Sequence, residues 1–265
     1  MHGRFCSAGG GDPAWSSGFI AIVDWVHRYY GDRQVLAQHY EGGKAYLEQS
    51  LLPHVNTSAG GSSLLDLSYP VTRYGDWCAP IGSPPTGTGP AIPRHTSNII
   101  NGFYWLKQLR IMAEAATSLG KTDDAKQWAT LAEAGAASFV ELYYDKAAGL
   151  FRDIECPAAA AAGRVACHNV SIDGELSVQT AQALPLFLGL PPTAADRKRA
   201  GDALAADVLN GSIFPGRTTT GLVGTKYVLS ELVAAGHAEV AMAVATSMEY
   251  PSWGRMLPAS VHPLG

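Results

Sequence analysis

The feature that most constrains the fold is a repeated pattern in which an apolar helical stretch ends at a glycine and another helix starts directly after it. The clearest case runs from Ser97 to Leu119, where apolar residues recur mostly at steps of three and four. Gly120 then suits the left-handed residue that commonly ends a helix, and Thr122 suits the N-cap of a second helix extending to about Tyr144. The sequence therefore predicts two helices joined by a tight turn.

The same pattern occurs at three further places, with turn glycines at Gly31, Gly189 and Gly236. Together the turns predict about eight helices and no strand ladder. Their unequal spacing argues against a solenoid of identical repeats, which would show one fixed period. It favours helical hairpins separated by long loops, where binding residues concentrate. The predicted fold class is all-α: an α/α toroid of hairpins around a loop-lined cavity, in a single helical domain covering residues 1–265.

The composition fits a folded domain, since 47% of the residues are hydrophobic and 16% are charged. A net charge of −4 offers no attraction for a phosphate backbone or an anionic lipid surface, so nucleic acid and membrane are not expected partners. The four cysteines form no Cys-x-x-Cys pair, no two histidines have metalloprotease spacing, and no phosphate-binding glycine motif occurs. We therefore expect no metal and no cofactor, and a neutral, hydroxyl-rich ligand suits such a surface better.

Two kinds of feature favour a secretory origin. Cys156 and Cys167 bracket a loop with five consecutive alanines that a disulfide would close. Asn56, Asn169 and Asn210 each begin an Asn-x-Ser/Thr sequon, the acceptor of N-linked glycans in secreted proteins. The N-terminus has no apolar stretch like that of a signal peptide, so the localisation stays open.

A series of short motifs runs in order along nearly the whole chain. It comprises Asp12-Pro13-Ala14-Trp15, Tyr74-Gly75-Asp76-Trp77-Cys78-Ala79-Pro80, Leu119-Gly120-Lys121-Thr122-Asp123-Asp124-Ala125, Gln179-Thr180-Ala181, Thr219-Thr220-Gly221-Leu222-Val223-Gly224-Thr225 and Tyr250-Pro251-Ser252-Trp253-Gly254. Each is a weak match alone, but their order and spacing resemble the α-L-rhamnosidases of glycoside hydrolase family 78 and their six-hairpin relatives. The resemblance implies a carbohydrate partner, a rhamnose-containing glycoside or polysaccharide.

The resemblance also implies a twelve-helix toroid and an inverting mechanism, in which one glutamic acid protonates the glycosidic oxygen and another glutamate activates water. In the family the first glutamate stands upstream of the matched region, in an Arg-Asp-Glu stretch followed by Gly-Trp. The second follows the Pro-Ser-Trp-Gly segment. Here Arg152-Asp153-Ile154-Glu155 lacks the Gly-Trp, and no glutamate follows Met256-Leu257. The catalytic residues are therefore unknown, and we expect the central-to-late part of such a domain, an incomplete ring.

Four side chains are predicted to bind substrate: Trp15, Asp76, Trp77 and Trp253. A pyranose ring stacks its C–H face on an aromatic ring, which is the role predicted for Trp15 and Trp77, whereas Trp253 is predicted to lie at the cavity. A carboxylate accepts hydrogen bonds from neighbouring hydroxyls, which is the role predicted for Asp76. The alternative for Asp76 is to cap the turn after Gly75, as aspartate often does.

Other candidates have a structural interpretation. Trp25, Trp105 and Trp128 are each in the middle of a predicted helix and are expected in the core. The stretch Thr218-Thr219-Thr220-Gly221 either presents hydroxyls to the cavity or caps the helix that starts near Gly221. Asp12, before Pro13, is favoured as a helix cap.

The leading hypothesis is a section of a glycoside hydrolase whose parent enzyme hydrolyses terminal α-L-rhamnosides by inverting acid–base catalysis. A non-catalytic or degenerate sugar-binding relative is an alternative, because the missing carboxylate pair typically supplies several powers of ten in rate. Another helical-barrel glycosidase, lyase or epimerase is a third reading, since one fold hosts many chemistries. Helices without their hairpin neighbours would expose apolar stripes, so we also expect self-association through exposed barrel edges.

Overall fold

The computed structural model describes residues 13–55, 63–65, 75–76, 79–80, 97–155, 168–169, 178–211 and 214–257. They form two compact units, which are described separately. The first unit holds the helices before residue 55, α4 from Ile100 onward and α5 up to Leu142. The second unit holds residues 75–80, 143–155 and the helices after residue 178. The expectation of a single domain stays a prediction.

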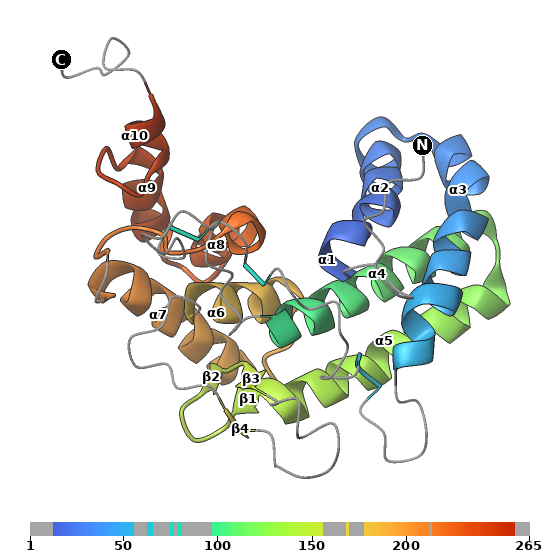
Figure 1. The fold of residues 1–265 in the computed structure, drawn as a ribbon, viewed down its shortest axis with the longest axis horizontal. Coiled ribbons are helices and arrows are strands. Elements are labelled where there is room, and N and C mark those ends of the chain that lie inside the picture. Colours follow the sequence, from blue (N-terminus) through green and yellow to red (C-terminus); the bar gives the residue numbers. More distant parts are fainter. Residues whose placement is uncertain are drawn as a thin grey trace, which may run out of the picture. The chain divides into compact units, whose positions relative to one another are not determined.

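The first unit starts with a helical hairpin (Figure 1). The short α1 (Pro13–Ser16) leads into α2 (Gly18–Tyr30), and α3 (Arg33–Tyr46) continues through a π-helical turn, η1 (Leu47–Leu51), and a 3₁₀ turn, η2 (Leu52–His54). Gly31 has a φ of +69° and donates its N–H to the carbonyl of His27, ending α2. The Asp32 carboxylate accepts hydrogen bonds from the N–H groups of Gln34 and Val35, at 2.8 and 3.1 Å, and starts α3. The predicted turn is confirmed.

The second hairpin of this unit joins α4 (Ser97–Leu119) to α5 (Thr122–Tyr143) through Gly120, at a φ of +75°. The side chains that fill this unit are fully buried aromatic and aliphatic groups: Phe103, Trp105, Leu106, Leu109, Trp128 and Phe139. Trp105 and Trp128 are therefore core residues, as predicted. The prediction for Trp25 is wrong: its side chain is 38% exposed, because α2 buries the face that carries Ile20, Ala21 and Asp24.

α1 and α2 carry large apolar side chains that remain at least one-third exposed: Trp15, Phe19, Ile22, Trp25, Tyr29 and Tyr30. Their concentration on one short segment is unusual for a helix in a folded chain, where a contiguous apolar patch often marks an interaction surface. Self-association stays a prediction, and these are side chains that would support it. In the described part of the chain, no helix has the length and apolar character required to cross a membrane.

The second unit contains two further hairpins and a short final helix (Figure 1). Its helices are α6 (Val178–Phe187), α7 (Ala194–Asn210), α8 (Leu222–Ala234), α9 (Ala238–Thr246) and α10 (Trp253–Met256). Gly189 and Gly236 have φ values of +66° and +92° at the two turns, as predicted. Close packing of α7 on α8 depends on Gly201, since a Cβ there would lie 2.5 Å from the Cβ of Ala235. Helical hairpins thus build both units.

Two small antiparallel ribbons precede α6. β1 (Tyr144–Asp145) pairs with β2 (Leu150–Phe151), and β3 (Ile154–Glu155) pairs with β4 (His168–Asn169). The sequence pattern predicted no strands, and each of these ribbons joins two residues to two. Such short pairings carry too few residues for an alternating apolar pattern to be visible.

The start of α7 is held by a network around Asp196. Its carboxylate accepts hydrogen bonds from Tyr144 Oη at 2.6 Å and Thr193 Oγ1 at 2.7 Å, and it forms an ion pair with Arg199. Thr193 is also the N-cap of α7, since its hydroxyl oxygen accepts the N–H of Asp196 at 3.1 Å. The hydrogen bonds from Tyr144, Thr193 and Arg199 lower the pKa of Asp196 to about 2.

This network predicts an acid-dependent loss of stability. An unfolded aspartate titrates near pH 4, so on acidification the unfolded chain takes up this proton before the folded chain does. The network therefore contributes fully above about pH 4, and its contribution disappears as the pH falls to about 2. Urea unfolding between pH 5 and 2 should show a steeper fall in the free energy of unfolding for the wild type than for Asp196→Asn. The exposed Asp123→Asn is the control, expected to match the wild type; equal slopes for all three proteins would contradict the prediction.

Candidate functional site

Asp76 lies at the N-terminus of α8 with 2% of its surface exposed. Its Oδ1 accepts the N–H groups of Val223 and Gly224, at 2.9 and 3.0 Å. Its Oδ2 accepts the N–H of Gly221 at 2.8 Å and the hydroxyl of Thr180. A carboxylate has about four lone-pair sites, and here each oxygen serves two donors. We call this arrangement the Asp76 clamp.

Two opposing effects act on the Asp76 carboxyl, and burial is the larger. Removal from water raises the pKa of Asp76 above its usual range, although the hydrogen bonds from Thr180, Gly224, Gly221 and Val223 oppose this rise. The first N–H groups of a helix carry partial positive charge, so an anion is well placed there. For Asp76 to bind or deprotonate another molecule, one of these donors would have to be displaced.

Three buried polar residues of α6 connect the Asp76 clamp to two other segments. Gln179, Thr180 and Gln182 are fully buried. Gln179 accepts the N–H of Thr219 at 2.9 Å and donates to the carbonyl of Arg217 at 3.3 Å. Gln182 accepts the N–H of Phe151 at 3.0 Å and donates to its carbonyl at 2.7 Å. Each side chain thus satisfies buried polar groups of a neighbouring loop or ribbon.

The C-terminal bend of the second unit approaches the same loop at Pro80. Tyr250 Oη donates a hydrogen bond to the carbonyl of Pro80 at 3.1 Å. Arg217 donates to the carbonyl of Tyr250 at 2.8 Å and forms an ion pair with Glu249. Trp253 then begins α10 and is 39% exposed.

Four of the six motifs in the sequence series therefore meet within the second unit: those containing Asp76, Thr180, Gly221 and Tyr250. Residues 4–260, which include all of these motifs, match the family described as the bacterial alpha-L-rhamnosidase 6 hairpin glycosidase domain. The chain belongs to this family.

Individual rhamnosidases agree with this assignment. The α-L-rhamnosidase of Streptomyces avermitilis is 26% identical over 248 residues, which cover 93% of this chain and 19% of that protein. The structure of the Dictyoglumus thermophilum α-L-rhamnosidase is 27% identical with a TM-score of 0.67, covering 93% of this chain and 23% of that one. The Aspergillus terreus α-L-rhamnosidase is 20% identical with a TM-score of 0.72, covering 93% and 24%. The rhamnosidase-family chain thus spans about a fifth of the length of these relatives.

The family assignment confirms the predicted fold class, an all-α six-hairpin glycosidase type, and the predicted resemblance to α-L-rhamnosidases. The predicted site residues have different outcomes. Trp77 and Asp12 lie outside the described residues. Trp15, in the first unit, and Trp253, in the second, are 43% and 39% exposed, and their sugar contacts stay predictions. Direct sugar binding by Asp76 also stays a prediction; the structure gives this carboxylate a capping role at α8.

The sequence analysis does not identify Gln179 and Gln182 as residues that hold the second unit together. Gln179 lies in the Gln179-Thr180-Ala181 motif and Gln182 directly follows it. The signal that could have revealed them is three polar residues within four positions of an otherwise apolar helix. For the threonine stretch, Thr219 and Thr220 are buried and Gly221 is the N-cap residue of α8, but the N–H groups at the start of this helix are capped by Asp76 and not by a threonine hydroxyl.

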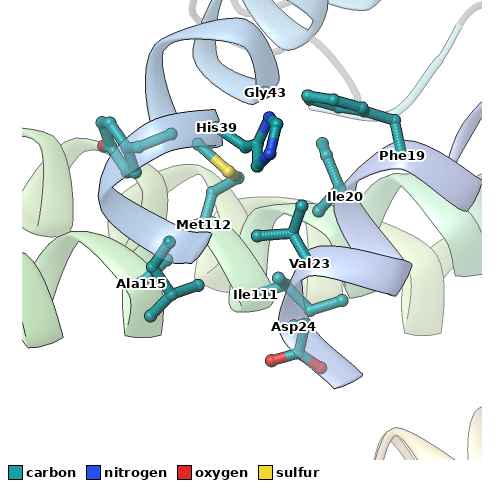
Figure 2. Close-up of a pocket in the computed structure, with 11 residues that line it drawn as sticks. Phe19, Ile20, Val23, Asp24, His39, Gly43, Ile111, Met112 and Ala115 are labelled. Carbon is teal, nitrogen blue, oxygen red and sulfur yellow. The ribbon is translucent and has the colours of Figure 1, made fainter. Parts of the chain in front are cut away.

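The first unit contains a small, partly open apolar pocket between α2, α3 and α4. Figure 2 shows Phe19, Ile20 and Val23 of α2 facing His39 of α3, with Met112 of α4 beneath. Its acidic residue, Asp24, is engaged by the guanidinium Nε of Arg28 at 2.7 Å. Sugar sites need several convergent polar groups, so this pocket is a gap in helix packing rather than a sugar site. Among the described residues, His, Cys, Asp and Glu form no group of three that could hold a metal ion.

The pocket makes Gly43→Ala a stabilising substitution. A Cβ at Gly43 would lie 3.1 Å from Met112 Sδ and 3.4 Å from Ile20 Cγ1, and the flexible Met112 side chain borders the pocket and can shift into it. Alanine also favours a helix interior over glycine, so we expect the free energy of unfolding to rise by about 0.5–1 kcal/mol. Urea unfolding measures this. The matched control is Gly201→Ala, which meets the Cβ of Ala235 and should destabilise; a loss of stability in Gly43→Ala would contradict the prediction.

Proposed function

We propose that this chain is a section of a catalytic domain whose parent polypeptide hydrolyses terminal α-L-rhamnosides by inverting acid–base catalysis. The observation that carries the proposal is the family match over residues 4–260. The Streptomyces avermitilis α-L-rhamnosidase, whose solved structure is a complex with L-rhamnose, supports the choice of sugar. In this chain Trp15, Trp77 and Trp253 are the proposed stacking surfaces for the sugar.

The chain's own contribution is to shape the sugar site rather than to transfer protons. An inverting glycosidase needs one carboxylic acid and one carboxylate, far enough apart to admit a water molecule. The family motifs that carry these two glutamates do not occur in this sequence. We therefore assign both proton transfers to segments of the parent polypeptide beyond residues 1–265.

The test uses the gene product extended in both directions until it includes the two glutamate motifs. We expect it to release 4-nitrophenol from 4-nitrophenyl α-L-rhamnoside, with inversion at the anomeric carbon visible by proton NMR. The matched β-D-glucoside is the control substrate and should not be cleaved. A folded extended protein that releases no rhamnose would overturn the proposed substrate, and retention at the anomeric carbon would overturn the mechanism.

Calorimetry on residues 1–265 with L-rhamnose addresses the chain itself. Binding without turnover is the expected result, and Trp253→Ala should weaken it whereas Trp25→Ala should not. Hydrolysis by residues 1–265 alone would contradict the assignment of the proton transfers to other segments. Absence of any L-rhamnose binding would contradict the proposed stacking surfaces.

A further inference from the structure

The segment from Gly75 to Pro80 is attached to the helices of the second unit at two described points. The first is the Asp76 clamp, whose donors come from α6 and from the N-terminus of α8. The second is the carbonyl of Pro80, which accepts the hydroxyl of Tyr250 at 3.1 Å. Trp77, a proposed sugar contact, stands in the sequence between these attachments.

The Asp76 clamp is a closely fitted contact. A Cβ on Gly224 would lie 2.9 Å from Asp76 Oδ2 and 2.8 Å from Thr220 Cγ2, and it would overlap the Thr180 hydroxyl. Such distances are shorter than real Cβ contacts, so glycine at position 224 is what lets the carboxylate approach the helix end. Gly75, at a φ of +47°, turns the chain immediately before Asp76.

Asp76 has little capacity left for a sugar. Its two oxygens already accept two donors each, and 2% of the residue is exposed. Hydrogen bonds to a charged carboxylate are stronger than those between neutral groups, so a sugar hydroxyl would have to displace a strong interaction. The same bonds make Asp76 well suited to hold its own segment in place.

We propose that Asp76 is a positioning residue: its carboxylate docks the chain at Gly75 and Asp76 onto the N-terminus of α8 and affects sugar binding through that attachment, without touching the sugar. The docking stands on the hydrogen bonds and close packing described above. The effect on sugar binding rests on the proposed function.

Hydrogen exchange tests the docking. In Asp76→Asn, one oxygen and its negative charge are lost, so the N–H groups of Gly221, Val223 and Gly224 should exchange about ten- to a hundred-fold faster. Exchange of the N–H groups of Gly75 and Ala79 should rise with them. The matched control is Asp196→Asn, which removes another buried carboxylate from a helix start in the same unit and should accelerate exchange at α7 alone. Unchanged exchange at Gly75 and Ala79 in Asp76→Asn would overturn the docking.

Affinity for L-rhamnose separates positioning from direct contact. Thr180→Val removes one donor and Gly224→Ala displaces the clamp, yet both leave the Asp76 side chain present. If Asp76 acts through the segment, both variants should weaken L-rhamnose binding several-fold, and Thr180→Ser, which restores a hydroxyl, should recover it. Loss of binding in Asp76→Asn with wild-type affinity in Thr180→Val and Gly224→Ala would show a direct contact and overturn the proposal. If the wild type binds no L-rhamnose, the proposed stacking surfaces fail while the exchange experiment still decides the docking.

Discussion

Replacement of Trp128 by alanine is expected to lower the free energy of unfolding by about 3–5 kcal/mol, the range for a large aromatic side chain removed from a core. Trp128 is fully buried in the first unit. Its indole Nε1 donates to Tyr40 Oη at 3.2 Å, and Tyr40 Oη donates to Asp124 at 2.9 Å. Lys44 Nζ completes this network, 2.7 Å from the same carboxylate. The substitution therefore leaves a cavity and also removes a hydrogen bond from Tyr40.

Urea unfolding followed by far-UV circular dichroism measures the effect, because it does not depend on tryptophan emission. Trp128→Phe is the matched control: it keeps most of the ring volume but loses the N–H, so a smaller cost of about 1–2 kcal/mol is expected. Trp25→Ala, at a partly exposed position, should cost less than Trp128→Ala. A loss below about 1 kcal/mol in Trp128→Ala would show that the first unit does not depend on this residue.

Local sequence signals predicted much of the fold. The four turn glycines at positions 31, 120, 189 and 236 all have positive φ, because a helix end followed at once by another helix requires a left-handed residue. Asp32 and Thr193 cap the helices that follow, since their donors lie two or three residues away in the chain. Such features are visible in a single sequence because both partners fall in one short window.

Features that depend on distant residues were not predictable in this way. Trp25 and Trp128 occupy similar mid-helix positions, and their burial differs because it depends on which neighbouring helix covers each face. Asp76 is followed by Trp77, which suggests a sugar-binding loop, yet its donors at Thr180 and Gly221 are 104 and 145 residues away. The motif series identified these residues as belonging together without indicating how they meet.

The role of Gln182 also depends on a partner distant in the sequence. We expect a large loss of stability when Gln182 is replaced by leucine. The amide pairs with both the N–H and the carbonyl of Phe151, at 3.0 and 2.7 Å, and both residues are fully buried. Leucine has a similar size but offers neither donor nor acceptor. Each buried backbone group left without a partner costs about 1–3 kcal/mol, so the free energy of unfolding should fall by about 2–5 kcal/mol.

Urea unfolding and hydrogen exchange together check this second prediction. The exchange of the Phe151 N–H should accelerate in Gln182→Leu more than global unfolding alone explains, because the hydrogen bond that protects it is absent. Gln127→Leu provides the control, since Gln127 is an exposed residue of α5 and its replacement should change stability by less than about 0.5 kcal/mol. If Gln182→Leu is as stable as the wild type, the apolar contacts of leucine offset the unpaired backbone groups. The buried amide of Gln182 would then not be needed to attach the β1–β2 ribbon to α6.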